Sequence, residues 1–303
     1  VAANSTRLDG ETLVYQAKFN SKDWSGSLVS YPLTSDGSAD IAHPKWDSDN
    51  TLTRSSTRNI YTYDGATTLA TVKLNLTGWE STAPTLLSAL KLSSESDNTK
   101  ANERLAWIFG SAAKESDASG LRTRTKVLGD IVNSDPAFAG RGSQRYENLP
   151  ASFGSATYAA YVTEKQKKVS GVYVRKAAVF VGANDGMMHA FDADTGTELF
   201  AYIPRGVYSK LAEISKKTYS HQYSVDGPMY SGDVYYDYDG DGDKEWRTVV
   251  AGSLGAGGRG VYALDITNVL DSTSGAPIVL FDVSAGENKI GRASCRERVY
   301  HPV

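Results

Sequence analysis

The residues best suited to chemistry form one acidic run in the C-terminal third of the chain. Five carboxylates alternate with other residues from Asp237 to Glu245, and Gly242 directly follows the third of them. Two like charges about 4 Å apart cost roughly 4 kcal/mol at an effective dielectric near 20, so carboxylates packed into one turn favour a cation among them. Calcium prefers such a set of oxygen ligands. The run therefore predicts a calcium site.

The spacing of the run matches an EF-hand calcium loop as far as the ninth position. That loop takes ligands from positions 1, 3, 5, 7 and 9, with a backbone carbonyl at 7 and glycine at 6. Position 12 is Thr248 instead of glutamate, and the β-branched residues 246–251 predict a strand where an EF-hand has a helix. A metal-free acidic hairpin turn is the alternative, since Asp and Gly are ordinary turn residues. The predicted ligands are the side chains of Asp237, Asp239, Asp241 and Glu245 and the carbonyl of Asp243.

Short segments with strand periodicity must position this loop. Apolar and polar side chains alternate within them, and turn residues such as Asn184-Asp185-Gly186 separate them. Two groups of strands are related, because Gly182 aligns with Gly252, and Ala190 aligns with Ala263 after a three-residue insertion. The repeat is longer than a propeller blade of about 40–50 residues, and residues 204–247, which contain the acidic run, account for the excess. The predicted strands cover residues 13–19, 24–33, 177–183, 187–191, 198–203, 248–252 and 260–265.

A helical region interrupts the strands. Residues 84–92 and 99–109 have helical periodicity, and Trp107 on the second helix is expected in the core. Residues 127–136 are predicted to return to strand and turn, and the basic run 165–168 is expected to face solvent. The apolar residues expected to be buried in the helices are Leu86, Leu90, Leu105 and Ile108.

Composition limits the function classes. The chain has 303 residues, 28 glycines, 18 tyrosines and a net charge of -3, which favours a β-rich protein and argues against nucleic acid as a partner. No run approaches the roughly 18 apolar residues of a membrane span, and the first residues lack the features of a signal peptide, so we expect any export signal upstream. Residues 290–299 resemble a translated adapter oligonucleotide. Without that tail and its Cys295 the chain has no thiol for disulfides or catalysis.

The run from Val179 to Asp192, Val-Phe-Val-Gly-Ala-Asn-Asp-Gly-Met-Met-His-Ala-Phe-Asp, closely resembles the C-terminal β-propeller of the PilC/PilY family of type IV pilus tip-associated adhesins. Residues 19–26, 128–134, 198–204, 224–227 and 252–265 share the resemblance, which is spread over most of residues 13–285. It implies an exported protein at the cell surface or pilus tip, associated with the outer membrane. It also implies minor pilins and a host or surface ligand as partners, and a calcium loop linked to pilus extension against retraction, and so to twitching motility.

Two other functions compete with this one. In a calcium-stabilised scaffold, the ion would only hold the insertion in place. Residues 190–200 also resemble the blade motif of quinoprotein dehydrogenases, although Phe200 replaces its tryptophan. No Ser/His/Asp constellation is apparent, and His43, His189 and His221 lack metal-ligand spacing, with His189 expected to be satisfied or exposed. We therefore expect no enzyme.

The sequence thus predicts a mainly β fold, a partial β-propeller with quinoprotein-like blades and a small helical insertion. Because a closed ring needs 4 to 8 blades of about 40–50 residues, we expect two or three recognisable blades with exposed edges that promote aggregation. The predicted divisions are N-terminal strands (1–82), a helical insertion and connector (83–126), propeller blades with the acidic loop (127–289), and a non-native tail (290–303).

Overall fold

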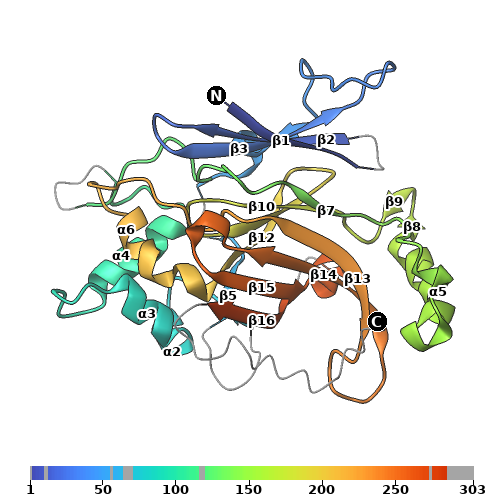
Figure 1. Ribbon diagram of the computed structural model, residues 1–303. Coiled ribbons are helices and arrows are strands. Elements are labelled where there is room, and N and C mark those ends of the chain that lie inside the picture. Colours follow the sequence, from blue (N-terminus) through green and yellow to red (C-terminus); the bar gives the residue numbers. More distant parts are fainter. Residues whose placement is uncertain are drawn as a thin grey trace.

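Three β-sheets are stacked face to face (Figure 1). The structure is a computed structural model and describes residues 2–9, 13–54, 57–63, 71–115, 120–272 and 275–284. The mainly β architecture and the partial propeller predicted from the sequence are confirmed. The domain division stays a prediction, and its last segment, with Cys295, lies outside the described residues.

The first and third sheets are formed by strands in chain order. The first sheet has the order β1-β2-β3-β4, with β1 Ala2–Asp9, β2 Leu13–Asn20, β3 Ser25–Pro32 and β4 Trp46–Asp47. The third has the order β13-β14-β15-β16, with β13 Met229–Tyr236, β14 Glu245–Ser253, β15 Gly260–Asp265 and β16 Ile278–Ser284. Both sheets are antiparallel throughout, as expected for strands joined by tight turns.

The middle sheet combines strands from distant parts of the chain. Its order is β6-β5-β12-β11-β10-β7, where β5 runs parallel to β12 with Tyr61 opposite Tyr202. Its strands are β5 Ile60–Tyr63, β6 Thr71–Lys73, β7 Ala137–Ala139, β10 Ala178–Gly182, β11 Met188–Asp192 and β12 Glu198–Ile203. The predicted blade of three strands is therefore present but is extended at both edges.

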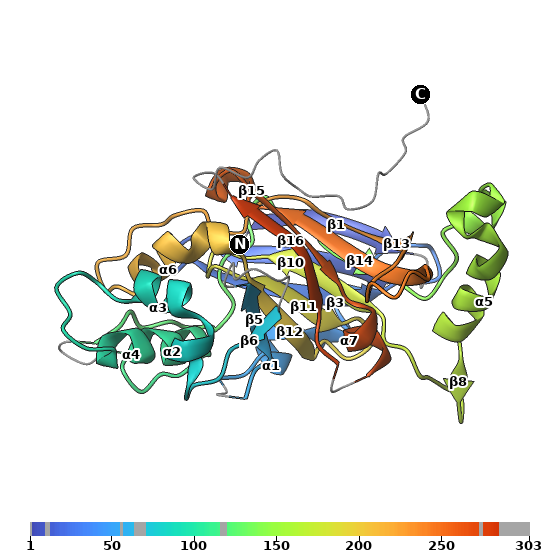
Figure 2. The ribbon, with the colours of Figure 1, turned by 90° about the horizontal axis from the view of Figure 1, so that it is seen from below.

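Helices flank the sheets at two ends, with α2, α3, α4 and α6 on one side and α5 on the other (Figure 2). The predicted helices are confirmed, and Leu86, Leu90, Leu105, Ile108 and Trp107 are all buried. The α-helices are α1 Ser48–Thr51, α2 Trp79–Thr82, α3 Pro84–Leu90, α4 Thr99–Ile108, α5 Ser155–Lys165, α6 Tyr208–Ile214 and α7 Thr267–Asp271. The short 3₁₀ helices are η1 Tyr146–Asn148, η2 Ala151–Phe153, η3 Arg205–Val207 and η4 Gly255–Gly257. The strands β8 Lys168–Val169 and β9 Val172–Tyr173 form a separate hairpin. Within the described part of the chain, no helix combines the length and apolarity that a membrane crossing requires.

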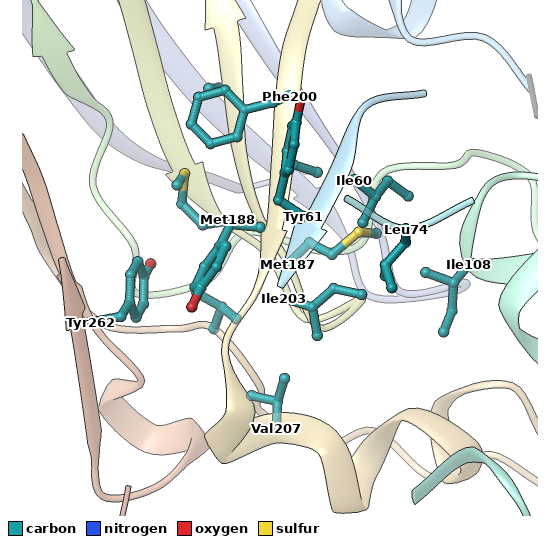
Figure 3. Packing of buried hydrophobic residues seen from close by; sticks show 14 of the residues in the cluster. Ile60, Tyr61, Leu74, Ile108, Met187, Met188, Phe200, Ile203, Val207 and Tyr262 are labelled. Carbon is teal, nitrogen blue, oxygen red and sulfur yellow. The ribbon is translucent and has the colours of Figure 1, made fainter. Parts of the chain in front are cut away.

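Apolar side chains fill both spaces between the sheets. Between the middle and third sheets, the Tyr202 and Tyr262 rings lie 5.6 Å apart within the cluster shown in Figure 3. Between the first and middle sheets, Leu28 and Phe191 belong to a second cluster. Each fully buried side chain of this size contributes about 1.5–3 kcal/mol. The stack is thus held by two apolar layers.

A third apolar surface has no partner within the described residues. Alternate residues of the third sheet point away from the middle sheet, and register places Tyr230, Ala251, Ala263 and Phe281 in one row across it. Tyr230 is 73% exposed and Phe281 37% exposed. The outward face of the third sheet therefore carries exposed apolar side chains.

The prediction of a strand within residues 127–136 is wrong. Apart from an isolated bridge between Gly129 and Ser25, this segment has no strand pairing, and the strand begins later, as β7. The segment is packed between the start of β3 and the turn before β11 instead: a Cβ on Gly129 would lie 2.5 Å from the backbone nitrogen of Asp185, and a Cβ on Gly26 would lie 2.1 Å from the Gly129 carbonyl oxygen. The close approach on both sides excludes a ladder.

The expectation that the whole basic run 165–168 faces solvent is also wrong. Lys165 ends α5 with its side chain fully buried, and its ammonium group lies 2.6 Å from Asp233 on β13. The other two lysines are exposed. The sequence pattern misses this contact because the partner carboxylate is 68 residues away.

Candidate metal site

The acidic run forms the connection between β13 and β14. Tyr236 pairs with Glu245 at the end of the ladder, so residues 237–244 form an eight-residue hairpin loop that projects from the third sheet (Figure 1). Both flanks are strands, which confirms that the loop lies in a β context and not between the helices of an EF-hand.

Glycine permits the sharp turns of this loop. Gly240 and Gly242 have φ angles of 81° and 97°, in the left-handed region that a side chain disfavours. The Asp237 carboxylate accepts hydrogen bonds from both of their backbone nitrogens, at 2.7 Å and 3.0 Å. Asp241 likewise accepts from the nitrogen of Asp243 at 2.8 Å. These bonds fold the chain around its own carboxylates.

Three of the predicted ligands converge. Asp237, Asp239 and Asp241, hereafter the Asp cluster, each offer a carboxylate oxygen, and these oxygens lie within 4.8 Å of one another. Among the described residues, no other group of three or more His, Cys, Asp or Glu side chains converges in this way. The Asp cluster is at the surface, with Asp239 and Asp241 exposed.

The two remaining predicted ligands are placed differently. Glu245 is not part of the converging group, because its Oε1 accepts a hydrogen bond from Nη1 of Arg247 at 3.0 Å. Asp243 is exposed and follows the Asp cluster at the end of the loop. Thr248, which the sequence excluded as a ligand, is buried in β14 and donates to Asp233 at 2.9 Å.

The loop is a region of negative potential. Asp239 raises the pKa of the neighbouring Tyr238 phenol, and Glu245 adds to the effect. The donor set consists of oxygens alone, which suits calcium or another hard cation and not zinc or copper. The residues present therefore fit calcium, with the Asp cluster as the part of the predicted ligand set that already converges.

Arg247 is the functional candidate that the sequence pattern missed. Its guanidinium donates to Asp265 on β15 at 2.7 Å and to Asn268 on α7 at 3.0 Å, and it lies 4.0 Å from the ring centroid of Tyr238. It also contacts Glu245, so one side chain connects both ends of the acidic loop to the sheet. The only sequence signal was an arginine two residues after the run.

A groove adjoins the loop. It has a volume of about 660 Å³ and separates α5 and the β8–β9 hairpin from the third sheet; we call it the α5 groove. Helix α5 was not predicted, although Tyr158, Tyr161, Val162 and Lys165 follow helical spacing that could have revealed it. The groove is lined at the end near the loop by Lys244, Glu245 and Arg247.

The histidines form no metal site among the described residues. His189 is fully buried, and its two ring nitrogens lie 2.8 Å from Glu198 and 3.1 Å from Asp185. Arg58 donates to Glu198 at 2.7 Å and completes the cluster. The sequence expectation of a satisfied imidazole is confirmed for His189. Because all four groups are satisfied by one another, the cluster is structural.

Comparison with known proteins identifies the family. Residues 128–300 match the family model described as the PilY1 beta-propeller domain. The chain belongs to the PilY1 β-propeller family. This match covers more than half of the chain and includes β7 and β10 to β12 of the middle sheet, the third sheet and the acidic loop. The resemblance stated from the sequence is thereby confirmed.

Relatives of known name agree with this assignment. The chain is 34% identical over 270 residues to a type IV pilus biogenesis factor PilY1 homolog of Xylella fastidiosa, covering 88% of this chain and 19% of that protein. It is 34% identical over 263 residues to type IV pilus biogenesis factor PilY1 of Pseudomonas aeruginosa, covering 84% and 21%. The chain thus spans about a fifth of these relatives. The crystal structure of the Pseudomonas aeruginosa PilY1 C-terminal domain matches 48% of this chain and 25% of that one, at 33% identity and a TM-score of 0.29.

Proposed function

We propose that the chain is the calcium-binding propeller part of a type IV pilus biogenesis factor. In this proposal it acts in pilus assembly and in adhesion at the pilus tip, on the outer surface of the cell. Minor pilins and a host or surface ligand are its partners. The observation that carries the proposal is the converging Asp cluster in a chain of the PilY1 β-propeller family. Catalysis is not part of it.

Electrostatics favours calcium binding to the loop. Three carboxylates with oxygens within 4.8 Å repel one another, and a divalent cation between them would turn that repulsion into attraction. The site is exposed, so an ion can enter and leave without the fold opening. Such access suits a regulatory site, and we propose that calcium occupancy influences pilus extension against retraction.

Calorimetry with calcium tests the site. We expect the intact chain to bind one calcium ion, and Asp237→Ala with Asp241→Ala to abolish the binding. The control is Asp36→Ala with Asp97→Ala, which removes the same charge from two fully exposed carboxylates outside the loop. If the loop variant binds calcium as the parent does, the ligand assignment is wrong.

The measured affinity separates the regulatory role from the scaffold role. A regulatory site in an extracellular module should have a dissociation constant on the order of 10⁻⁴ to 10⁻³ M, near ambient calcium. A site that only stabilises the hairpin should bind far more tightly and stay filled. Binding in the nanomolar range would therefore favour the scaffold.

Pilus assembly itself is tested in the organism that encodes the chain. We expect deletion of the gene to remove pili from the cell surface and to abolish twitching motility, while the pilin content of the cells stays unchanged. Restoring the gene with the two loop substitutions should return pili whose number no longer responds to calcium. Normal piliation of the deletion strain would exclude the assembly role.

A further inference from the structure

The acidic loop shares one predicted ligand with the wall of the α5 groove. Glu245 is the ninth residue of the acidic run, directly after the loop, and also lines the groove, where its Oε1 accepts from Nη1 of Arg247 at 3.0 Å. We propose that the Glu245 carboxylate exchanges between Arg247 and a calcium ion held by the Asp cluster, so that loop occupancy is relayed to the α5 groove. The inference rests on the proposed calcium site and adds a regulatory connection to it.

The two partners differ in how firmly they are held. The Arg247 side chain is 7% exposed, and its remaining hydrogen bonds to Asp265 and Asn268 fix the guanidinium to β15 and α7. The Glu245 side chain is 51% exposed and stands at the first position of β14. Arg247 can therefore stay in place when Glu245 turns away, which makes the glutamate the moving part.

The exchange replaces the weak ion pair of Glu245 with Arg247 by a stronger contact with the calcium ion. An ion pair with an exposed partner contributes little to stability, because water competes for both charges. A carboxylate that joins three others around a divalent cation gains more, since ligand charge sets the affinity of such loops. Calcium binding can therefore draw Glu245 away from Arg247 without unfolding the strand that carries both residues.

Arg247 also touches the loop at its other end. Its guanidinium lies 4.0 Å from the ring centroid of Tyr238, which stands between the first two members of the Asp cluster. A rearrangement of the loop around an ion would thus change the contacts of Arg247 with both Tyr238 and Glu245. When Glu245 leaves, the Nη1 edge of Arg247 is left facing the groove, whose wall becomes more cationic.

Nuclear magnetic resonance of the arginine side chains provides the direct test. Calcium is titrated into the full 303-residue chain, and the Nε–Hε signal of Arg247 is followed beside calorimetry. Tyr238→Leu identifies that signal by removing the aromatic ring above it while leaving Arg247 unchanged. We expect the signal to shift with the same dissociation constant that calorimetry gives.

Two variants separate the exchange from a general charge effect. Glu245→Gln should weaken calcium binding about tenfold, since one charged ligand is lost, and should remove most of the Arg247 shift. Lys244→Gln is the matched control, because it changes the charge by one unit at the adjacent residue of the same groove. It should bind calcium at least as tightly as the parent and keep the shift.

The two measurements distinguish failure of the relay from failure of the calcium site. If calcium binds through the Asp cluster but the Arg247 signal stays unchanged, or shifts equally in Glu245→Gln, the relay is wrong and the calcium site stands. A water-mediated contact that leaves the Glu245–Arg247 pair intact would give this result. If calorimetry detects no binding that depends on the Asp cluster, the proposed site fails and the relay fails with it.

Discussion

The ammonium nitrogen of Lys165 lies 2.6 Å from Oδ2 of Asp233, and both side chains are fully buried. Burial lowers the pKa of Lys165, although the nearby Asp233 carboxylate acts in the opposite direction. Tyr158 donates to the same oxygen at 2.7 Å, and Thr248 donates to the other oxygen at 2.9 Å. This satisfied cluster is a buried polar contact between α5 and the third sheet.

Lys165→Met should therefore destabilise the protein strongly. Removing one partner of a buried pair leaves the other charge without compensation, which typically costs about 3–5 kcal/mol. Adding Asp233→Asn removes the orphaned charge and should recover part of the loss, because the amide oxygen can accept from one of the two hydroxyl groups of Tyr158 and Thr248 while the amide nitrogen donates to the other. Urea denaturation measures both variants. Equal stability of Lys165→Met and the parent would show that the buried pair is dispensable.

The cluster around His189 should make stability depend on pH. Burial alone would lower the pKa of His189, but Asp185 and Glu198 outweigh it and raise the value from 6.5 to about 9. The folded protein then binds the proton more tightly than the unfolded chain. The stabilisation is complete below pH 6.5 and is lost as pH rises through about 9, by on the order of 3 kcal/mol.

Thermal denaturation between pH 6 and pH 9.5 checks this dependence. We expect His189→Gln to be less stable than the parent at pH 6 and to lose little further stability on raising the pH. A parent profile that stays flat across this interval would contradict a protonated His189 in the folded state. His43→Gln is the control, because that histidine is on the surface, where its side chain is 82% exposed.

Gly196→Ala should loosen the contact between the first two sheets. Gly196 has a φ of 72°, and an added Cβ would lie 2.5 Å from the Trp46 ring, whose indole nitrogen donates to the carbonyl of Ala193 at 2.9 Å. Gly37→Ala is a matched control, since Gly37 has a φ of 84° and open space around it. In both variants the left-handed backbone conformation should lower stability by about 1–2 kcal/mol, but only in Gly196→Ala does overpacking lower it by about 1–3 kcal/mol more. Calorimetric melting should separate the two; equal losses would mean that Trp46 moves aside freely.

The outward face of the third sheet should cause self-association. Tyr230 and Val261 are 73% and 49% exposed on this face. Replacing both with lysine should reduce the scattering of light at high protein concentration and leave the melting temperature nearly unchanged, because neither side chain is buried. Ser93→Lys with Ser94→Lys adds the same charge at exposed polar positions and should help less. An equal benefit from both pairs would assign the effect to net charge.

Local patterns predicted the parts of this fold that depend on local contacts. Alternation located β2, β3 and β10 to β12, and helical spacing located α3 and α4 with their buried leucines. The same patterns missed Lys165, because only the distant Asp233 makes its burial favourable. They also missed the pairing of β5 with β12, because parallel pairing needs a partner far along the chain.

The acidic loop shows the same limit on a smaller scale. Spacing along the chain predicted the Asp cluster, whose members converge in the structure, and the ligand assignment itself stays a prediction. Spacing could not predict the direction of Glu245, because a side chain at the start of a strand follows the contacts available there, and Arg247 is held in reach by Asp265. Sequence motifs define which residues are near one another, whereas competing partners decide where each side chain points.

The composite middle sheet also constrains synthesis. The first sheet can be complete once residue 47 has been synthesised, whereas β5 can pair with β12 only much later. The hydroxyl of Thr62 on β5 donates to the carbonyl of Ile203, which is 141 residues further along the chain. At about 5–20 residues per second, that delay is on the order of ten seconds, during which Ile60 and Tyr61 lack their final cover. A nascent chain interrupted before residue 203 would therefore expose an apolar strand that is paired only with β6 and has one open edge, so translation speed and chaperone supply should govern the yield of this protein more than its final stability does.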